Sequence, residues 1–208
     1  STTMKTIMGI MKPIAGDVLF KGESIAGMKT HNIVRKGVVL VPEGRQILQN
    51  MTVRENLEMG AYQRNDAEGI KEDLSKVFER FPRLFERQGQ FAGTLSGGES
   101  QRIKLAYFML MNAEQSGKAK EQKILFIFDE PTTGLHFYDV EKLLKSFDAL
   151  LAKGHSIVVV EHNADVIRAA DWVIDLGPEA GDGGGHIVFA GTPEDLRSCK
   201  ESYTARYI

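Results

Sequence analysis

A run of five apolar residues, Ile124 to Phe128, restricts the fold of this chain more than any other feature. Such a run predicts a strand buried on both faces, which is typical of a parallel sheet covered by helices. Asp129, Glu130 and Pro131 follow it directly. Because open α/β sheets bind ligands at the carboxyl ends of their strands, the run predicts functional carboxylates at this edge. The alternative interpretation is a solvated loop after a core strand.

Strand and helix signals alternate over most of the chain. Apolar runs at 38–41 and 157–160 predict two more buried strands, and helix-like apolar spacing occurs at 2–11 and 140–151. This alternation favours the α/β class, with a largely parallel sheet flanked by helices.

The stretch from 52 to 94 differs from the rest because it carries helix signals only. Thr52 and Glu55 match a capping box, which opens a helix. We therefore expect a small helical lobe at 52–94, inserted between a partial core lobe at 1–51 and the rest of the core at 95–208.

The composition narrows the class of protein. The 208 residues carry a formal net charge of −2, without the basic excess of most nucleic-acid-binding proteins, so direct DNA binding is not expected unless a local basic patch supplies it. One cysteine, Cys199, excludes an internal disulfide framework and a Cys-rich zinc site, and we expect no zinc. No apolar run approaches the about 20 residues that span a bilayer, so we expect a cytoplasmic protein.

The segment Leu95-Ser96-Gly97-Gly98-Glu99 is suited to contact a phosphate. The two glycines let the backbone approach an anion closely, and the Ser96 hydroxyl and the free N–H groups of a helix start would face it. The helix dipole favours negative charge at the same place. The alternative interpretation is an ordinary capped helix.

Together and in this order, the two segments resemble those of the ATP-binding-cassette (ABC) ATPase family. Leu95–Glu99 matches the family's signature motif, and Ile124–Glu130 matches its Walker B strand. His162 matches the switch histidine that contacts the γ-phosphate, and Glu43 falls at the Q-loop, where most members have Gln. The resemblance implies a P-loop NTPase-like fold that uses ATP and Mg²⁺.

The resemblance also assigns roles to these residues. Asp129 would hold Mg²⁺, usually through water, and Glu130 would orient and deprotonate the attacking water, so that Glu130 and His162 would be catalytic. Ser96 to Glu99 would contact ATP bound by a second ABC ATPase domain, arranged head to tail with this one.

The phosphate-binding loop of the family has the pattern G-x-x-G-x-G-K-[ST]. Only its last hydroxyl residue has a match here, as Ser1, which would contact Mg²⁺ and phosphate and is followed by Thr2. Its glycines, its lysine and the preceding strand would lie before residue 1. Because these groups supply most of the phosphate contacts, we expect the isolated chain to bind ATP poorly. Gly181–Gly185 is Gly-rich, but no Lys-Ser/Thr follows it, so we expect a connection there.

Two finer resemblances divide the chain near Leu95–Glu99. Residues 1–94 resemble the ATPase subunit of branched-chain amino-acid transporters (LivF-like), on 40–45 (LVPEGR) and 51–62 (MTVRENLEMGAY). Residues 95–208 resemble the carboxyl-terminal end of the excinuclease ATPase UvrA, on 100–106 (SQRIKLA), 129–137 (DEPTTGLHF) and 160–163 (VEHN). The hypothesis is a chimera, and a single natural lineage is the alternative.

These resemblances imply an ABC-type ATP-binding and ATP-hydrolysing domain with a half like that of a DNA excision-repair protein. Two alternatives stay open. One is the ATP-binding subunit of a branched-chain amino-acid transporter, with a membrane permease as partner instead of DNA-repair proteins. The other is a non-enzymatic scaffold fragment whose motifs are idle.

Overall fold

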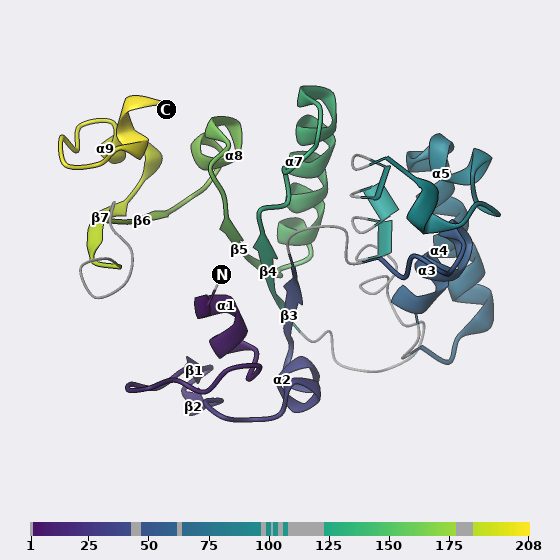
Figure 1. The fold of residues 1–208 in the computed structure, drawn as a ribbon, viewed down its shortest axis with the longest axis horizontal. Helices are drawn as coiled ribbons and strands as arrows, with labels where there is room; N and C mark the ends of the chain where they lie inside the picture. The colour runs from purple at the N-terminus through teal and green to yellow at the C-terminus, as the bar shows by residue number, and fades with distance from the viewer. Residues whose placement is uncertain are drawn as a thin grey trace.

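The computed structural model describes residues 2–42, 47–61, 64–96, 99–100, 102–103, 106–107, 123–177 and 185–208. A parallel sheet lies at its centre, with strands β3 (Val38–Val41), β4 (Leu125–Asp129) and β5 (Ser156–Val160) in the order β3-β4-β5 (Figure 1). The three strands predicted from apolar runs are thus confirmed, each to within one residue. The α/β class with a parallel sheet is confirmed with them.

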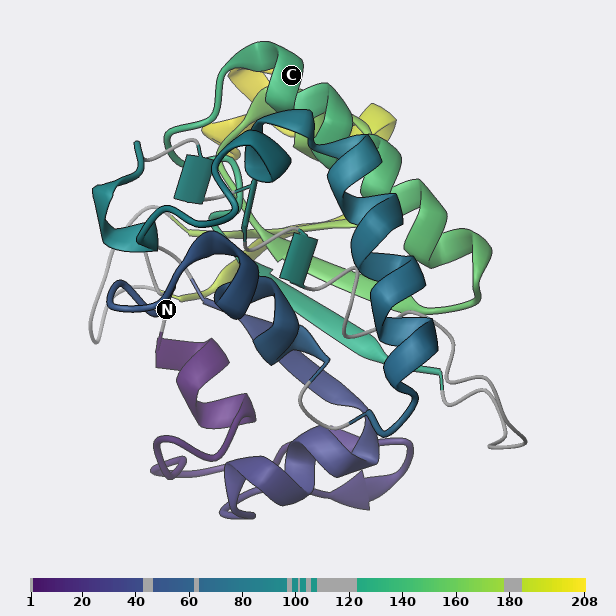
Figure 2. The same cartoon turned by 90° about the vertical axis from the view of Figure 1, so that its right-hand side faces the viewer.

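Strand β4 is buried on both faces, as its continuous apolar run predicts. Phe126 and Phe128 pack with β3 and with Phe147 of α7 (Phe137–Ala152) on one face. Ile127 points to the other face, because side chains alternate along a strand. There it meets a cluster built from α1 (Thr2–Ile7), α2 (Thr30–Lys36) and the strands between them. The sheet is therefore covered by helices on both sides (Figure 2).

Helix α1 ends earlier than the apolar spacing at 2–11 predicts. Gly9 adopts a φ of +67°, and a Cβ at this position would lie 2.0 Å from the carbonyl oxygen of Met28. Only glycine fits such an approach, and its left-handed backbone ends the helical turn. The chain then reverses through the antiparallel pair β1 (Leu19–Phe20) and β2 (Glu23–Ser24).

The helical lobe contains α3 (Val53–Gly60), α4 (Ala67–Arg80), α5 (Pro82–Glu86) and the 3₁₀ turn η1 (Ala92–Thr94), which lie on the right in Figure 1. The predicted capping box is present, since Thr52 and Glu55 each accept a hydrogen bond from the other's backbone N–H. The lobe buries its own apolar cluster, which also includes Leu95, Ile103 and Ala106. The boundaries 1–51, 52–94 and 95–208 remain predictions.

A buried arginine fixes the start of α4. Arg64 contacts Asp66 at 2.6 Å and Asp73 at 2.9 Å, and hydrogen bonding to Asp66 raises its pKa further. Gly69 leaves room for this group, because a Cβ there would lie 2.2 Å from the Asp66 carboxylate and would displace it from Arg64.

The carboxyl-terminal part follows β5 on the left of Figure 1. Helix α8 (Ala164–Arg168) leads to the antiparallel pair β6 (Val173–Leu176) and β7 (Ile187–Gly191), and then to α9 (Pro193–Leu196) and the 3₁₀ turn η3 (Thr204–Arg206). Thr192 caps α9 by accepting a hydrogen bond from the N–H of Asp195. Among the described residues, no helix has both the length and the apolar character that a membrane span requires.

Candidate active site

The ends of β4 and β5 bring together the residues that follow them. Asp129 is in register with Val160, and the N–H of Glu130 donates to the Val160 carbonyl at 2.9 Å. Because the two strands are parallel, the chain leaves both at the same edge of the sheet. Glu130, Glu161 and His162 therefore meet at the edge that the apolar run predicts.

Glu130 has a strained backbone. Its φ is +45°, a left-handed conformation that costs a non-glycine residue about 1–2 kcal/mol. The tight turn that begins at Glu130 holds it there, since the Thr133 N–H donates to the Glu130 carbonyl and the Thr133 hydroxyl to its carboxylate, both at 3.3 Å. Pro131 takes the second position of this turn, which its fixed φ favours. Strain of this kind is typical of functional sites.

The carboxylate of Glu130 and the imidazole of His162 face the same space. Their Oε1 and Nε2 atoms are 3.9 Å apart, with 37% of the Glu130 side chain and 86% of the His162 side chain exposed. This separation is too long for a direct hydrogen bond. A third atom can, however, lie within about 3 Å of both groups, which is the reach needed for proton transfer. The structure thus brings the two predicted catalytic residues together.

Glu161 is the residue at this edge that sequence reasoning missed. Its carboxylate accepts hydrogen bonds from the N–H groups of Thr132 at 2.7 Å, His162 at 2.8 Å and Asn163 at 3.0 Å. The only signal in the sequence is its place before His162. Its hydrogen bond with Thr132, which lies 29 residues earlier in the chain, follows from the pairing of β4 with β5.

Asp129 is the predicted Mg²⁺ residue, and its position fits that role. It is the last residue of β4 and only 6% exposed, directly before Glu130. Mg²⁺ keeps several waters and takes one or two carboxylates together with substrate phosphates, so it does not need a cage of protein ligands. The described residues contain no group of three or more His, Cys, Asp or Glu arranged to hold a metal ion. One carboxylate at the end of β4 is suited to Mg²⁺ that is held mainly through water and phosphate.

The signature segment forms a capping box. The N–H and the hydroxyl of Ser96 donate to Glu99 at 3.0 and 2.8 Å, and the Glu99 N–H donates to the Ser96 hydroxyl at 3.4 Å. Burial raises the pKa of Glu99, but the Ser96 hydrogen bonds and the charges of Arg87 and Arg102 outweigh it, so the pKa is lowered overall. The Ser96 hydroxyl thus serves the helix start in this structure.

Several predicted site residues lie outside the described part of the chain. They are Ser1, Glu43, Gly97 and Gly98, and most of the Gly181–Gly185 connection lies outside it as well. Thr2 is described and is the exposed first residue of α1, where its carbonyl accepts a hydrogen bond from the Thr6 hydroxyl at 3.1 Å.

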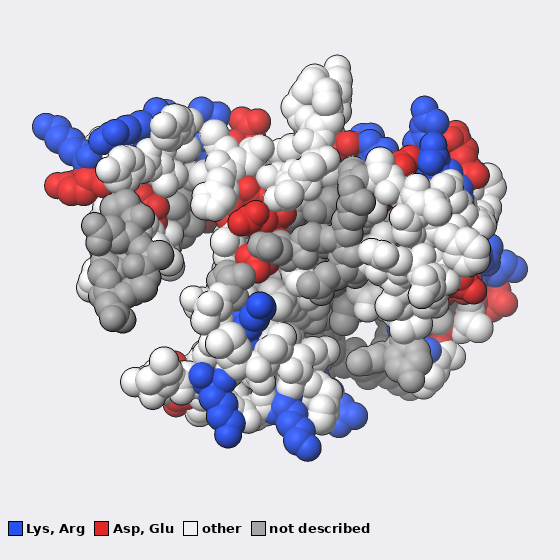
Figure 3. Space-filling view, in the orientation of Figure 1, with Lys and Arg blue, Asp and Glu red and all other residues white. Residues whose placement is uncertain are grey.

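Charge at this edge sets a requirement for any bound phosphate. Asp129, Glu130 and Glu161 are acidic, and His162 is the basic side chain that faces Glu130. Figure 3 shows acidic groups near the middle of this face, with Lys and Arg at its lower and upper left margins. Polyanions bind beside carboxylates only when cations or N–H donors neutralise them. A triphosphate here therefore needs a bound cation or further N–H donors to offset this charge.

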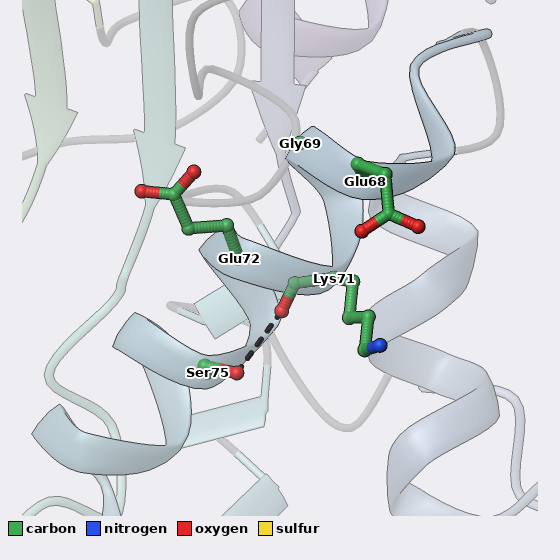
Figure 4. Close-up of a pocket in the computed structure, with 5 residues that line it drawn as sticks. All are labelled: Glu68, Gly69, Lys71, Glu72 and Ser75. Carbon is green, nitrogen blue, oxygen red and sulfur yellow. Dashed lines mark hydrogen bonds between the residues drawn. The ribbon is translucent and has the colours of Figure 1, made fainter.

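A hollow on the molecule's surface lies away from this edge. It is lined by one side of α4, with Glu68, Gly69, Lys71, Glu72 and Ser75 (Figure 4). The Ser75 hydroxyl donates to the Lys71 carbonyl, and the charges on this side are mixed. The hollow carries no catalytic arrangement.

A buried strand that ends in two carboxylates, a histidine after the neighbouring strand and a capped helix start are features of an α/β core of the P-loop NTPase type. The family described as ABC transporter matches residues 1–133. The chain belongs to this family, as an ABC ATPase domain.

Similar proteins refine this assignment. The chain is 41% identical over 192 residues to UvrABC system protein A of Agrobacterium fabrum, and 43% identical over 193 residues to that of Brucella abortus. Each alignment covers 92% of this chain but only 16% of the relative, so the chain spans a small part of these proteins. A solved "ATP binding subunit of ABC transporter" shares the fold with a TM-score of 0.73 and 26% identity, covering 95% of this chain and 75% of that one. The UvrA-like resemblance is confirmed, whereas the LivF-like half and the chimera remain predictions.

Proposed function

We propose that this chain is an ATP-hydrolysing ABC domain of the UvrA type that serves DNA excision repair in the cytoplasm. The observation that carries the proposal is the Glu130–His162 pair, 3.9 Å apart where the parallel strands β4 and β5 end. The similarity to UvrABC system protein A supports the repair assignment.

Each residue at the edge has a role that its position allows. Glu130 orients a water and accepts its proton, while His162 donates a hydrogen bond to the terminal phosphate. Asp129 holds Mg²⁺ through water, and Mg²⁺, when bound, neutralises phosphate charge. Ser1, Thr2 and Glu43 keep the phosphate and Mg²⁺ contacts that the family resemblance implies.

Ser96 to Glu99 would act on a different nucleotide, held by a second ABC ATPase domain arranged head to tail. The capping box sets a condition for this contact, because the Ser96 hydroxyl donates to Glu99. Ser96 must turn from the Glu99 carboxylate to reach a phosphate. The helix N-terminus, with its free N–H groups, then binds the anion in place of its own cap.

The printed sequence contains no G-x-x-G-x-G-K-[ST] pattern. We therefore expect the 208-residue chain to bind Mg-ATP weakly by itself. Thermal unfolding with and without millimolar Mg-ATP measures this, because a ligand that binds only the folded state raises its stability.

The test of the enzyme is hydrolysis of Mg-ATP by the purified chain, alone and mixed with an intact UvrABC system protein A. Glu130→Gln should lower turnover by about 100-fold or more, the usual contribution of a general base. Glu141→Gln is the matched control, because Glu141 is exposed on α7 and pairs with Lys145. If the folded wild-type chain shows no turnover, either alone or mixed with the intact protein, the result contradicts the proposal and favours a non-enzymatic scaffold.

A second candidate is the ATP-binding subunit of a branched-chain amino-acid transporter. The observation in its favour is the structural similarity to a transporter's ATP-binding subunit. Under this hypothesis the helical lobe α3–α5 contacts a membrane permease. A pull-down experiment that compares binding of this chain to permease loops with its binding to repair proteins distinguishes the two candidates. We expect repair proteins, and no direct binding of duplex DNA by this chain.

A further inference from the structure

We infer that Glu161 is a positioning residue that ties the loop after β4 to the loop after β5 and so sets the distance between Glu130 and His162. The inference rests on the proposed function for the roles of Glu130 and His162. The link between the two loops does not depend on that proposal, because it consists of hydrogen bonds that Glu161 accepts in the structure.

The two oxygens of Glu161 serve two different loops. Oε1 accepts from the N–H of Thr132 at 2.7 Å, in the turn that begins at Glu130. Oε2 accepts from the N–H groups of His162 at 2.8 Å and Asn163 at 3.0 Å. Hydrogen bonds from N–H donors to a charged carboxylate are about twice as strong as those between neutral groups. One half-buried side chain therefore fixes both loops at once.

The hydrogen bond from Thr132 to Glu161 affects Glu130 because Thr132 lies in the same turn. The N–H of Glu130 is used by Val160, Pro131 has none, and that of Thr133 closes the turn. Thr132 carries the remaining N–H of the turn, two residues after the strained Glu130. Because a strained backbone persists only where its surroundings hold it, the hydrogen bond to Glu161 helps to keep Glu130 at its positive φ.

A carboxylate is the suited group here. Glutamine keeps one acceptor oxygen and replaces the other by an NH₂ group, which is a donor and would face a backbone N–H. Glu161→Gln therefore keeps the hydrogen bonds to one of the two loops and loses those to the other. Alanine loses the hydrogen bonds to both loops.

The first experiment measures amide hydrogen exchange of the purified chain in Glu161→Ala and Glu161→Gln. We expect exchange at Thr132 to rise by about tenfold or more in Glu161→Ala, along with His162 and Asn163, because a lost hydrogen bond exposes each N–H. Glu161→Gln should lie between wild type and Glu161→Ala. The matched control is Glu55→Gln, which removes a carboxylate that also accepts a backbone N–H at 2.7 Å but lies in the helical lobe.

The second experiment measures Mg-ATP hydrolysis in the same variants. Glu161→Ala should lower kcat by about 10- to 100-fold while KM stays within about twofold, since a misplaced catalytic pair affects the reaction more than binding. Unchanged exchange at Thr132 in a folded Glu161→Ala variant overturns the tie. Raised exchange with an unchanged kcat overturns the positioning role. A wild-type chain without turnover, both alone and mixed with intact UvrABC system protein A, rejects the proposed function, and exchange at Thr132 then tests the link between the two loops by itself.

Discussion

The guanidinium of Arg102 donates a hydrogen bond to the carboxylate of Asp139 at 2.6 Å. Arg102 lies in the helical segment after Ser96, and Asp139 lies in the first turn of α7. Because Ile103 and Ala106 of the same segment pack in the apolar cluster of the helical lobe, the pair links that cluster to a helix that packs on the central sheet. Arg80 of α4 makes a second link to α7, through the hydroxyl of Ser146 at 3.3 Å. Helix α7 thus connects the lobe to the edge that carries Glu130.

Breaking the Arg102–Asp139 pair should destabilise the chain. The Asp139 side chain is 9% exposed and that of Arg102 is 27% exposed, so removing one charge leaves the other poorly solvated. Loss of one partner from a fully buried pair costs about 3–5 kcal/mol, and partial exposure of Arg102 lowers our expectation for Asp139→Asn to about 2 kcal/mol. Urea unfolding measures the change. Asp165→Asn, at the exposed Arg168 pair, should cost under about 0.5 kcal/mol, and equal effects would contradict the burial argument.

Glu130→Gly should separate stability from activity. Glycine adopts a φ of +45° without strain, so the variant should be at least as stable as wild type, by up to about 1 kcal/mol. It also removes the proposed base, so hydrolysis should be lost. Glu130→Gln loses the base but keeps the strain, and so should not gain stability. The measurements are thermal unfolding and turnover of the two variants, and a Glu130→Gly variant with a clearly lower Tm would count against a strained site.

Gly60→Ala should disturb the contact between α3 and the helix after Ser96. A Cβ at Gly60 would lie 2.5 Å from the carbonyl oxygen of Tyr107, a backbone atom that cannot move alone. Overpacking of this kind costs about 1–3 kcal/mol. Gly89→Ala is the control, because a Cβ there meets nothing within 4 Å. Unfolding free energies of the two variants within about 0.5 kcal/mol of each other would refute the close approach.

The parts of the site that sequence could predict are those set by local patterns. An apolar run predicts β4 and the carboxylates at its end, and a Ser or Thr three residues before a Glu predicts the caps at Thr52 and Ser96. The partners of Glu161 and Asp139 could not be predicted in this way. They depend on which strands pair, in which register, and on how two distant helices cross.

Two further features of the structure could not be predicted from the sequence pattern. Helix α1 stops at Ile7 because Gly9 approaches the Met28 carbonyl, a tertiary contact that overrides apolar spacing. The left-handed backbone of Glu130 is equally invisible in sequence, since a glutamate at that position ordinarily predicts a negative φ.

The capping box of α3 should weaken in acid. Hydrogen bonds from the backbone and hydroxyl of Thr52 lower the pKa of Glu55 below its ordinary value of 4.5. A lowered folded-state pKa means that the stabilisation is complete above pH 4.5 and is lost as the pH falls through the folded value. The difference in unfolding free energy between wild type and Glu55→Gln should therefore shrink as the pH falls below 4.5. Urea unfolding at a series of pH values measures it.

Thr52→Ala provides the matching variant for this cap. It removes the other half of the box and should cost about 1 kcal/mol at neutral pH. Adding Glu55→Gln to Thr52→Ala should still lower stability, because the backbone N–H of residue 52 continues to donate to the Glu55 carboxylate. The further loss should be smaller than that of Glu55→Gln alone, because the hydrogen bond from the Thr52 hydroxyl is already absent. Full additivity of the two changes would show that the residues act separately.

Strand β5 should govern how the chain associates at high concentration. In the described sheet β5 pairs with β4 on one side only, and Val158 on β5 is 43% exposed. An edge strand with an exposed apolar side chain is a site of strand-to-strand association, and a lysine there opposes it. Val158→Lys should therefore reduce light scattering by concentrated samples without a large fall in Tm. Met59→Lys changes a similarly exposed apolar residue on α3, away from any strand edge, and should leave scattering unchanged. An equal reduction by both variants would point to net charge, rather than the β5 edge, as the cause.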